Sequence, residues 1–248
     1  MRPIVKTDKR DAQGNPLEFN PYGTAKEELV KEMGSYCAFC EKYNSRSALH
    51  VEHINGMECK DANGVQIYKH LENRWDNFLL ACVNCNSIKG AKDVAIVEPF
   101  LPHQHNLLHY IEVIEGGIIK AKEGIEEPER KRAVAFIDLV GLDRYPGQPR
   151  YSDRDDRWDN RLKVYDLASR YFDKYDSQNP TTDVETIVDV AGLSGFFSVW
   201  YYRFKGHDEV IRALINGIRV NGKHVHPFKG THSASFDAAD HYATRARP

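Results

Sequence analysis

Two pairs of closely spaced cysteines are the residues of this sequence that most clearly indicate a chemistry. The first pair is Cys37-x-x-Cys40 and the second is Cys82-x-x-Cys85. Each such turn places two thiolates on one zinc ion, and two turns supply the four tetrahedral ligands that zinc prefers. Four thiolates leave no open coordination position, so this zinc would be structural. The alternatives are two disulfides or four unrelated buried cysteines, and Cys59 is expected to be a free thiol in a loop.

Polar residues that suit catalysis lie between and just after the cysteine pairs. They are Glu52, His53, Asn77, Asn86 and Lys89. A histidine can act as a general base near neutral pH. However, a lone histidine on a strand is more often structural, and strand alternation sends neighbouring side chains to opposite faces unless the chain bends. Lys89 follows Asn86 on the same helix face and could contact a substrate phosphate, or it could be a solvated lysine.

Local patterns predict the elements that would position these residues. Segment 49–54 alternates apolar and polar residues, as a half-buried strand does. Segment 55–74 is polar and rich in turn formers, which predicts a long loop. A short apolar run at 78–81 predicts a second strand, and a helix is expected over about 82–92.

The flanking segments contain helix and hairpin signals. Residues 1–24 are expected to be an irregular arm, followed by a helix over 24–33 that Thr24 caps together with Glu27. Segments 110–114 and 118–122 flank Gly116-Gly117, which predicts a hairpin. A helix follows, with a buried face that comprises Ala133, Phe136, Ile137 and Val140.

The C-terminal part reads as mainly helical, with a boundary expected over 144–157. A long helix is predicted to present one apolar face, formed by Trp158, Leu162, Tyr165, Phe172 and Tyr175. Thr182 and Glu185 form a capping box for the next helix, whose face holds Ile187, Val188 and Ala191. Segment 210–218 predicts a further amphipathic helix. The tail after about residue 220 is expected to be loosely structured.

Two groups in this sequence permit a second interpretation. Trp200, Tyr201 and Tyr202 lie beside basic residues and could stack on bases, but an amphipathic core helix is the favoured interpretation. His103, His105 and His109 are close together and could hold a second metal, although their spacing is loose for a metal site.

Composition sets broad limits on the protein. The chain has 248 residues and a formal net charge of −2, so it is no polycation. If it binds nucleic acid, basic residues must be gathered locally or a partner must supply the field. No apolar run approaches the roughly 20 residues that span a bilayer, and the first residues lack the apolar stretch of a secretory signal. We therefore expect a cytoplasmic protein with reduced thiols and no membrane association.

The order of these motifs resembles the signature of the HNH endonucleases. The resemblance lies in Val51-Glu-His53-Ile54 and in Trp75-Asp-Asn77-Phe-Leu-Leu-Ala-Cys82-x-x-Cys85-Asn86-x-x-Lys89-Gly90. It covers about residues 37–90. It implies a ββα-metal fold, in which two strands and a helix surround one divalent cation and a zinc on four cysteines braces the unit.

The resemblance also implies roles for single residues. His53 would be the general base that takes a proton from the attacking water, and Asn77 would brace the loop that holds it. Glu52 and Asn86 would bind the catalytic cation, where family members often carry Asp and His. An oxygen-lined site favours Mg²⁺ or Mn²⁺. This interpretation requires Glu52, His53 and Asn86 to converge.

A wider resemblance links the chain to HNH proteins of bacterial anti-phage systems of the Septu and retron-associated kind. It includes Met1-Arg-x-Ile4-x-Lys6 and Pro99-Phe-Leu-Pro102, and it reaches to about residue 145. It implies an antiviral defence nuclease that acts on nucleic acid, with DNA favoured over RNA, and an ATPase partner. The alternative is a non-catalytic zinc-stabilised module that binds nucleic acid or protein.

The expected fold class is therefore α+β. It combines a ββα-metal HNH core, braced by a four-cysteine zinc site, with a mainly α-helical C-terminal region. The expected segments are an N-terminal arm and short helix over 1–36, a nuclease domain over 37–145 and a helical region over 146–248.

Overall fold

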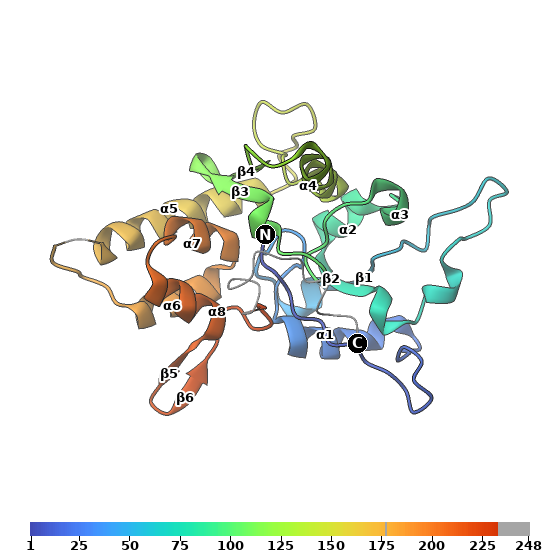
Figure 1. Cartoon of the computed structure of the whole chain (residues 1–248), viewed down its shortest axis with the longest axis horizontal. Coiled ribbons are helices and arrows are strands. Elements are labelled where there is room, and N and C mark those ends of the chain that lie inside the picture. The colour runs from blue at the N-terminus through green and yellow to red at the C-terminus, as the bar shows by residue number, and fades with distance from the viewer. Residues whose placement is uncertain (177, 233–248) are drawn as a thin grey trace.

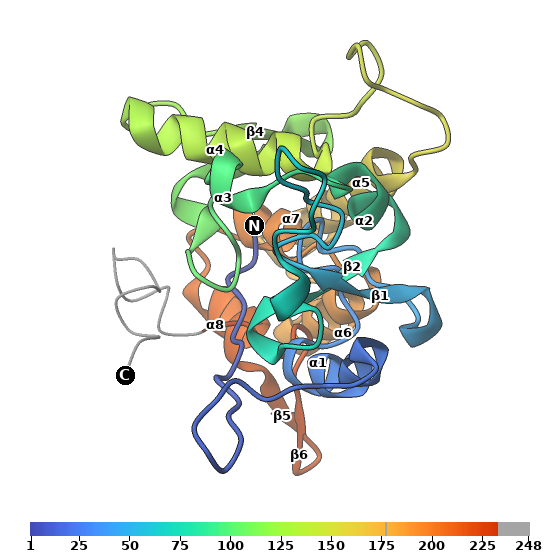
Figure 2. The same cartoon turned by 90° about the vertical axis from the view of Figure 1, so that its right-hand side faces the viewer.

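The computed structural model describes residues 1–176 and 178–232 and has a mixed α/β architecture (Figure 1). In this part of the chain the strands form three separate two-stranded antiparallel sheets. Four helices lie on one side of the molecule: α5 (Arg157–Tyr175), α6 (Val184–Ser194), α7 (Phe197–Arg203) and α8 (Asp208–Asn216) (Figure 1). On the other side, which faces the viewer in Figure 2, lie β1 (Leu49–His53), β2 (Phe78–Cys82) and α2 (Val83–Lys89). No helix in the described ranges is long and apolar enough to cross a bilayer.

The central unit consists of two strands followed directly by a helix. Strand β1 (Leu49–His53) pairs antiparallel with β2 (Phe78–Cys82), so that Leu49 lies opposite Cys82 and His53 lies opposite Phe78. Helix α2 (Val83–Lys89) begins immediately after β2 and ends at Gly90. The predicted strands and helix are confirmed, although the helix is shorter than expected. The long loop 55–74 projects from this unit (Figure 1).

The N-terminal segment packs into the core rather than forming a free arm. Met1, Arg2 and Ile4 are each only 1% exposed. Helix α1 (Lys26–Met33) follows a 3₁₀ turn over Tyr22–Ala25. The predicted capping box is therefore wrong: the Thr24 hydroxyl donates to the Pro21 carbonyl within the turn, and Ala25 occupies the N-cap position.

The middle of the chain matches its sequence pattern. Strands β3 (Ile111–Ile114) and β4 (Ile118–Ala121) form the expected hairpin around two glycines with positive φ. The short helix α3 (Val94–Val97) precedes them, and α4 (Glu127–Val140) follows. The buried side of α4 contains the residues expected from its periodicity, because Ala133, Phe136, Ile137 and Val140 are all buried.

Helix α5 (Arg157–Tyr175) buries a different face from the one that its aromatic residues indicate. Its buried residues are Arg157, Arg161, Val164 and Ala168, whereas the aromatic side chains are only half-buried. Burial of the aromatic face is what the sequence predicts, since buried arginines are rare. Both arginines find their partners across the chain, as described below.

The remaining elements are short helices and a small hairpin. They are α6 (Val184–Ser194), α7 (Phe197–Arg203), α8 (Asp208–Asn216), β5 (Ile218–Val220) and β6 (Lys223–Val225). Helix α6 begins one residue later than predicted, because the Asp183 carboxylate, rather than Thr182, accepts from the Thr186 amide. Ordered β5–β6 pairing also replaces the loose structure expected after residue 220; the end of that tail lies outside the described residues.

One continuous hydrophobic core contains residues from the N-terminal, central and C-terminal segments of the described chain. It runs from Met1 through the β1–β2 unit to Trp200 in α7 and Phe228 near the end of the described residues. The three expected segments thus share a core, and their boundaries remain a prediction.

Candidate functional site

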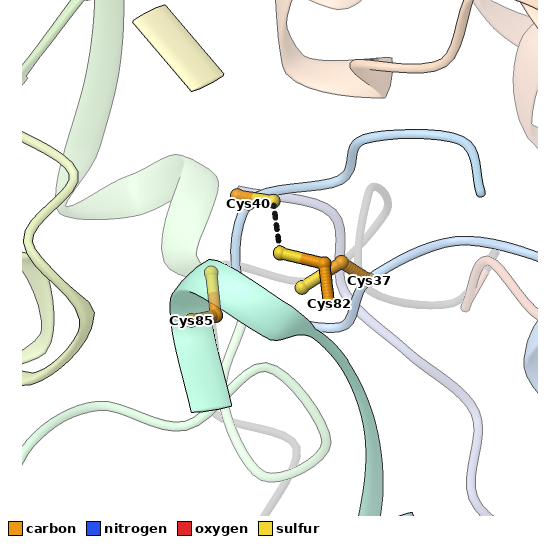
Figure 3. A group of neighbouring side chains, drawn as sticks. All are labelled: Cys37, Cys40, Cys82 and Cys85. Atoms are coloured by element: carbon orange, nitrogen blue, oxygen red, sulfur yellow. Dashed lines mark hydrogen bonds between the residues drawn. The ribbon is translucent and has the colours of Figure 1, made fainter. Parts of the chain in front are cut away.

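The four cysteines of the two Cys-x-x-Cys turns form a compact buried cluster. Their sulfur atoms all lie within 4.8 Å of one another, and each cysteine is buried. Cys37 and Cys40 come from the loop after α1, while Cys82 ends β2 and Cys85 lies on the first turn of α2 (Figure 3). This geometry could hold a zinc ion on four thiolates.

No disulfide forms among the cysteines, which are all free thiols. Within the cluster, Cys40 Sγ and Cys82 Sγ lie 3.7 Å apart, far beyond the length of a covalent bond (Figure 3). Cys59 lies outside the cluster, where its thiol donates to the Ala91 carbonyl at 3.4 Å. It is a free thiol in a loop, as expected, but it is buried.

The thiols of the cluster strongly affect one another's ionisation. Hydrogen bonds from Cys37 and Cys40 hold the pKa of Cys82 far below its usual value, whereas a hydrogen bond with Cys37 raises the pKa of Cys40. Burial is the main cause that raises the pKa of Cys85. Four negative charges at this distance repel strongly, and a divalent cation at their centre removes that repulsion.

His53 ends β1 in a partly exposed position. Its Nε2 lies 2.8 Å from the carbonyl oxygen of Glu72. The Tyr22 ring packs edge-on against the imidazole at 4.7 Å between centroids, and Phe78 lies at 5.3 Å on β2. Burial is the main cause that lowers the pKa of His53, with a smaller contribution from the nearby Lys89 ammonium. Both effects favour the neutral imidazole.

Glu52 and Lys89 form a buried ion pair beside His53. The Lys89 Nζ lies 2.8 Å from Glu52 Oε1, and the two side chains are only 1% and 8% exposed, respectively. The same Nζ donates to the His53 carbonyl at 2.7 Å. Burial raises the pKa of Glu52, and the Lys89 charge partly opposes this effect. Lys89 therefore points inward in this structure, away from the surface where a substrate phosphate would lie.

Asn77 ties the start of β2 to the chain that follows His53. Its Oδ1 accepts from the Asn55 amide at 2.8 Å, and its Nδ2 donates to the Asn55 carbonyl at 3.2 Å. The Asn77 carbonyl also accepts from the Ile54 amide at 2.8 Å. Asn77 thus contacts the backbone one and two residues after His53.

Replacing Asn77 by alanine is expected to destabilise the protein by about 1–3 kcal/mol, because the partly buried backbone amide and carbonyl of Asn55 lose their partner. Urea unfolding would measure the change. Asn63→Ala, in an exposed turn of the loop, is the matched control and should leave the midpoint unchanged. Equal effects of the two substitutions would contradict the bracing role.

Of the two residues expected to hold a catalytic cation, Glu52 is paired with a lysine in this structure. Asn86 lies partly exposed on α2, and its side chain forms no hydrogen bond to other described residues. Glu52 faces Lys89, while the Nε2 of His53 faces Glu72. Within the described residues, the cysteine cluster is the only group of three or more His, Cys, Asp or Glu side chains with metal-binding geometry.

The other candidate residues take structural positions. Trp200 is fully buried, and the Tyr202 hydroxyl donates to the Ile111 carbonyl at 2.7 Å, which fits a core helix better than a base-stacking surface. Among the described residues, no metal-ligand group includes His103, His105 or His109.

Two contacts at the site escaped the sequence analysis. Tyr22, which is 40% exposed, lies in an irregular segment with no motif that would indicate its packing on His53. Arg157 donates to Cys85 Sγ at 3.1 Å, although the two residues are 72 positions apart in the sequence. The only available signal was the placement of Arg157 and Arg161 one helical turn apart on α5.

No model of a known protein family matches the chain, and no curated protein matches it significantly.

Proposed function

We propose that the chain is an HNH-type endonuclease that hydrolyses phosphodiester bonds, with His53 as its general base and a zinc on the four cysteines as its structural brace. The observation that carries the proposal is the setting of His53. A partly exposed imidazole ends the first strand of a strand–strand–helix unit and is oriented by a backbone carbonyl.

The hydrogen bond to Glu72 defines which nitrogen of His53 can act as the base. A carbonyl oxygen only accepts hydrogen bonds, so Nε2 carries the proton. Nδ1 then keeps its lone pair, and it forms no hydrogen bond with other described residues. The lowered pKa of His53 keeps this tautomer uncharged at neutral pH.

The proposed reaction is an in-line displacement at phosphorus. Nδ1 of His53 accepts a proton from a water molecule, whose oxygen forms the new bond to phosphorus. The bond between phosphorus and the leaving oxygen breaks with its electron pair, and solvent returns a proton to that oxygen. Positioning and electrostatics account for most catalysis of such transfers, so the rigid mounting of His53 by Asn77 and Lys89 supports the proposal.

The resemblance implies Mg²⁺ or Mn²⁺ on Glu52 and Asn86, but the observed donor set does not fit this assignment. The Lys89 ammonium already neutralises the Glu52 carboxylate at 2.8 Å, where a cation would be repelled. We therefore assign no step to that cation. A dependence of cleavage on Mg²⁺ or Mn²⁺ remains an expectation from the motif alone.

Replacing His53 by alanine is expected to reduce cleavage by about 10²–10⁴-fold, the usual contribution of a general base. The measurement is cleavage of plasmid DNA and of RNA with Mg²⁺ or Mn²⁺. His50→Ala, on the exposed face of the same strand, is the matched control and should cleave normally. Undiminished cleavage by the His53 variant would eliminate this residue as the base.

The pH dependence provides an independent check. Burial lowers the pKa of His53 below its ordinary value of 6.5, so the base form persists to lower pH. Cleavage should therefore fall only as pH drops below 6.5, through the lowered pKa. Because the pKa of His53 is lower in the folded protein than in the unfolded chain, the unfolded chain binds the proton more readily. The contribution of His53 to the stability of the folded protein is therefore also lost as pH falls below 6.5.

The pairing of Glu52 with Lys89 favours a second candidate function, a non-catalytic zinc-stabilised module that binds nucleic acid or protein. In that case His53→Ala and Asn86→Ala would leave binding intact, while Cys82→Ser would abolish it by unfolding. Binding and cleavage of the same labelled nucleic acid, measured in parallel, separate the two functions.

The wider resemblance supports a cytoplasmic role in anti-phage defence, with DNA as the favoured substrate and an ATPase as partner. The formal charge of −2 agrees with a nuclease whose partner helps to capture nucleic acid. Affinity purification from the native host, followed by identification of the bound proteins, tests this proposal.

A further inference from the structure

A buried arginine of α5 reaches the cysteine cluster. Arg157 is 2% exposed, and its Nη1 donates to Cys85 Sγ at 3.1 Å and to the Val140 carbonyl at 2.7 Å. Its Nη2 donates to the Gly141 carbonyl at 2.9 Å and to Asp155 Oδ2 at 2.6 Å. One guanidinium thus joins the cluster, the end of α4 and the start of α5.

The second Cys-x-x-Cys turn has another contact with the same segment. Asn84, which lies inside this turn, donates from Nδ2 to Asp155 Oδ1 at 3.0 Å. Asp155 in turn accepts from the Arg157 Nε at 2.7 Å. Two residues just before and at the start of α5 therefore hold the second Cys-x-x-Cys turn: Asp155 through the side-chain amide of Asn84, and Arg157 through the sulfur of Cys85.

The first Cys-x-x-Cys turn is attached to a different C-terminal helix. Glu41, directly after Cys40, is buried and accepts from the Ser198 amide at 2.9 Å and from the Ser198 hydroxyl at 2.8 Å. Ser198 lies in the first turn of α7. Each of the two turns is thus connected to its own helix, α5 or α7.

The charges around the cluster support a functional link. Four thiolates around one divalent cation carry a net negative charge, which is costly to bury without nearby positive groups. Arg157 supplies such a group by direct contact. Arg161, one turn further along α5, is also 2% exposed and donates to the backbone carbonyls of Gly117 and Leu142. It forms no salt bridge with a carboxylate among the described residues, so its positive charge is a second one that α5 buries.

We propose that Arg157 donates a hydrogen bond to the Cys85 thiolate of the zinc-loaded protein. Metal occupancy then holds α5 in place through this bond, and it holds α7 in place through the contact of Glu41 with Ser198. The inference rests on the zinc centre of the proposed function and is independent of cleavage by His53. It gives the C-terminal helices a defined role, because their seating on the central unit depends on the metal.

The first test measures zinc affinity by competition with a chromophoric chelator. Arg157→Met leaves Asp155 buried without its partner, so Asp155→Asn/Arg157→Met is the variant to use. We expect about 10–100-fold weaker zinc binding, the usual effect of losing a hydrogen bond to a metal ligand. Arg170→Met, exposed on the same helix, is the control. Affinity within about twofold of that control would overturn the inference.

The second test uses the unmodified chain and so does not depend on the folding of any variant. Hydrogen exchange is compared before and after zinc is removed with a chelator. We expect the amides of α5 and α7 to lose protection on metal removal. Unchanged protection in both helices would overturn the proposal. If the chain binds no zinc, both this proposal and the zinc site are wrong. The catalytic role of His53 would then still be decided by the cleavage assay of His53→Ala.

Discussion

Replacing Cys82 by serine is expected to unfold the central unit and, with it, the shared core. Cys82 ends β2, lies opposite Leu49 in β1 and occupies the N-cap position of α2. Loss of one thiolate leaves three ligands in a buried cluster. Structural zinc in small sites contributes about 10–16 kcal/mol of apparent binding free energy, comparable to the 5–15 kcal/mol of a typical domain's stability.

Circular dichroism, thermal unfolding and bound zinc content measure this effect together. Cys59→Ser is the matched control, because it also changes a buried thiol but lies outside the cluster. A serine hydroxyl can still donate to the Ala91 carbonyl that Cys59 contacts, so the control should remain folded and metal-loaded. A Cys82 variant with the stability and zinc content of the control would refute the structural metal site.

Replacing Lys89 by methionine is expected to destabilise the protein by about 3–5 kcal/mol, because it leaves the buried Glu52 carboxylate without its partner. The substitution also removes the donor to the His53 carbonyl, so cleavage should fall with stability. The stability loss should shrink at acid pH. Burial raises the pKa of Glu52, so this carboxyl takes up a proton readily once the lysine charge is gone.

A double-mutant cycle in urea identifies the origin of this effect. The second substitution is Glu52→Leu, and the double variant should recover most of the loss, since an apolar pair can replace a buried ion pair. Lys31→Met removes an exposed partner of Glu28 on α1 and should cost no more than about 1 kcal/mol. If Lys89→Met and Lys31→Met had the same effect, Lys89 would not be a buried structural cation.

If Lys89→Met destabilises the protein and Glu52→Leu restores its stability, the residues around His53 have roles different from those in the HNH endonuclease motif. Glu52 and Lys89 would then act together as a support for the end of β1, and Asn77 would support the chain beyond it. The chemistry would then depend on His53, whose Nδ1 forms no hydrogen bond with other described residues. Tyr22, partly exposed against the imidazole, is the nearest aromatic candidate for contact with substrate.

The sequence alone determined the local elements of the central unit and the grouping of its four cysteines. Alternation marked β1, an apolar run marked β2, and the β3–β4 hairpin followed from its glycine pair. The cysteine spacing correctly indicated four sulfurs close enough for one ion. These features depend on neighbours a few residues apart, for which side-chain type and backbone preference are sufficient.

Only the tertiary structure decided which polar groups meet. The sequence pattern placed Glu52 on the first strand and Lys89 on the following helix. Their pairing, however, depends on how α2 packs against β1. The buried face of α5 differs from the predicted one for the same reason: a charged side chain is buried only where distant carbonyls, carboxylates and thiols satisfy it. Such partners lie far apart along the chain, and no local pattern encodes their meeting.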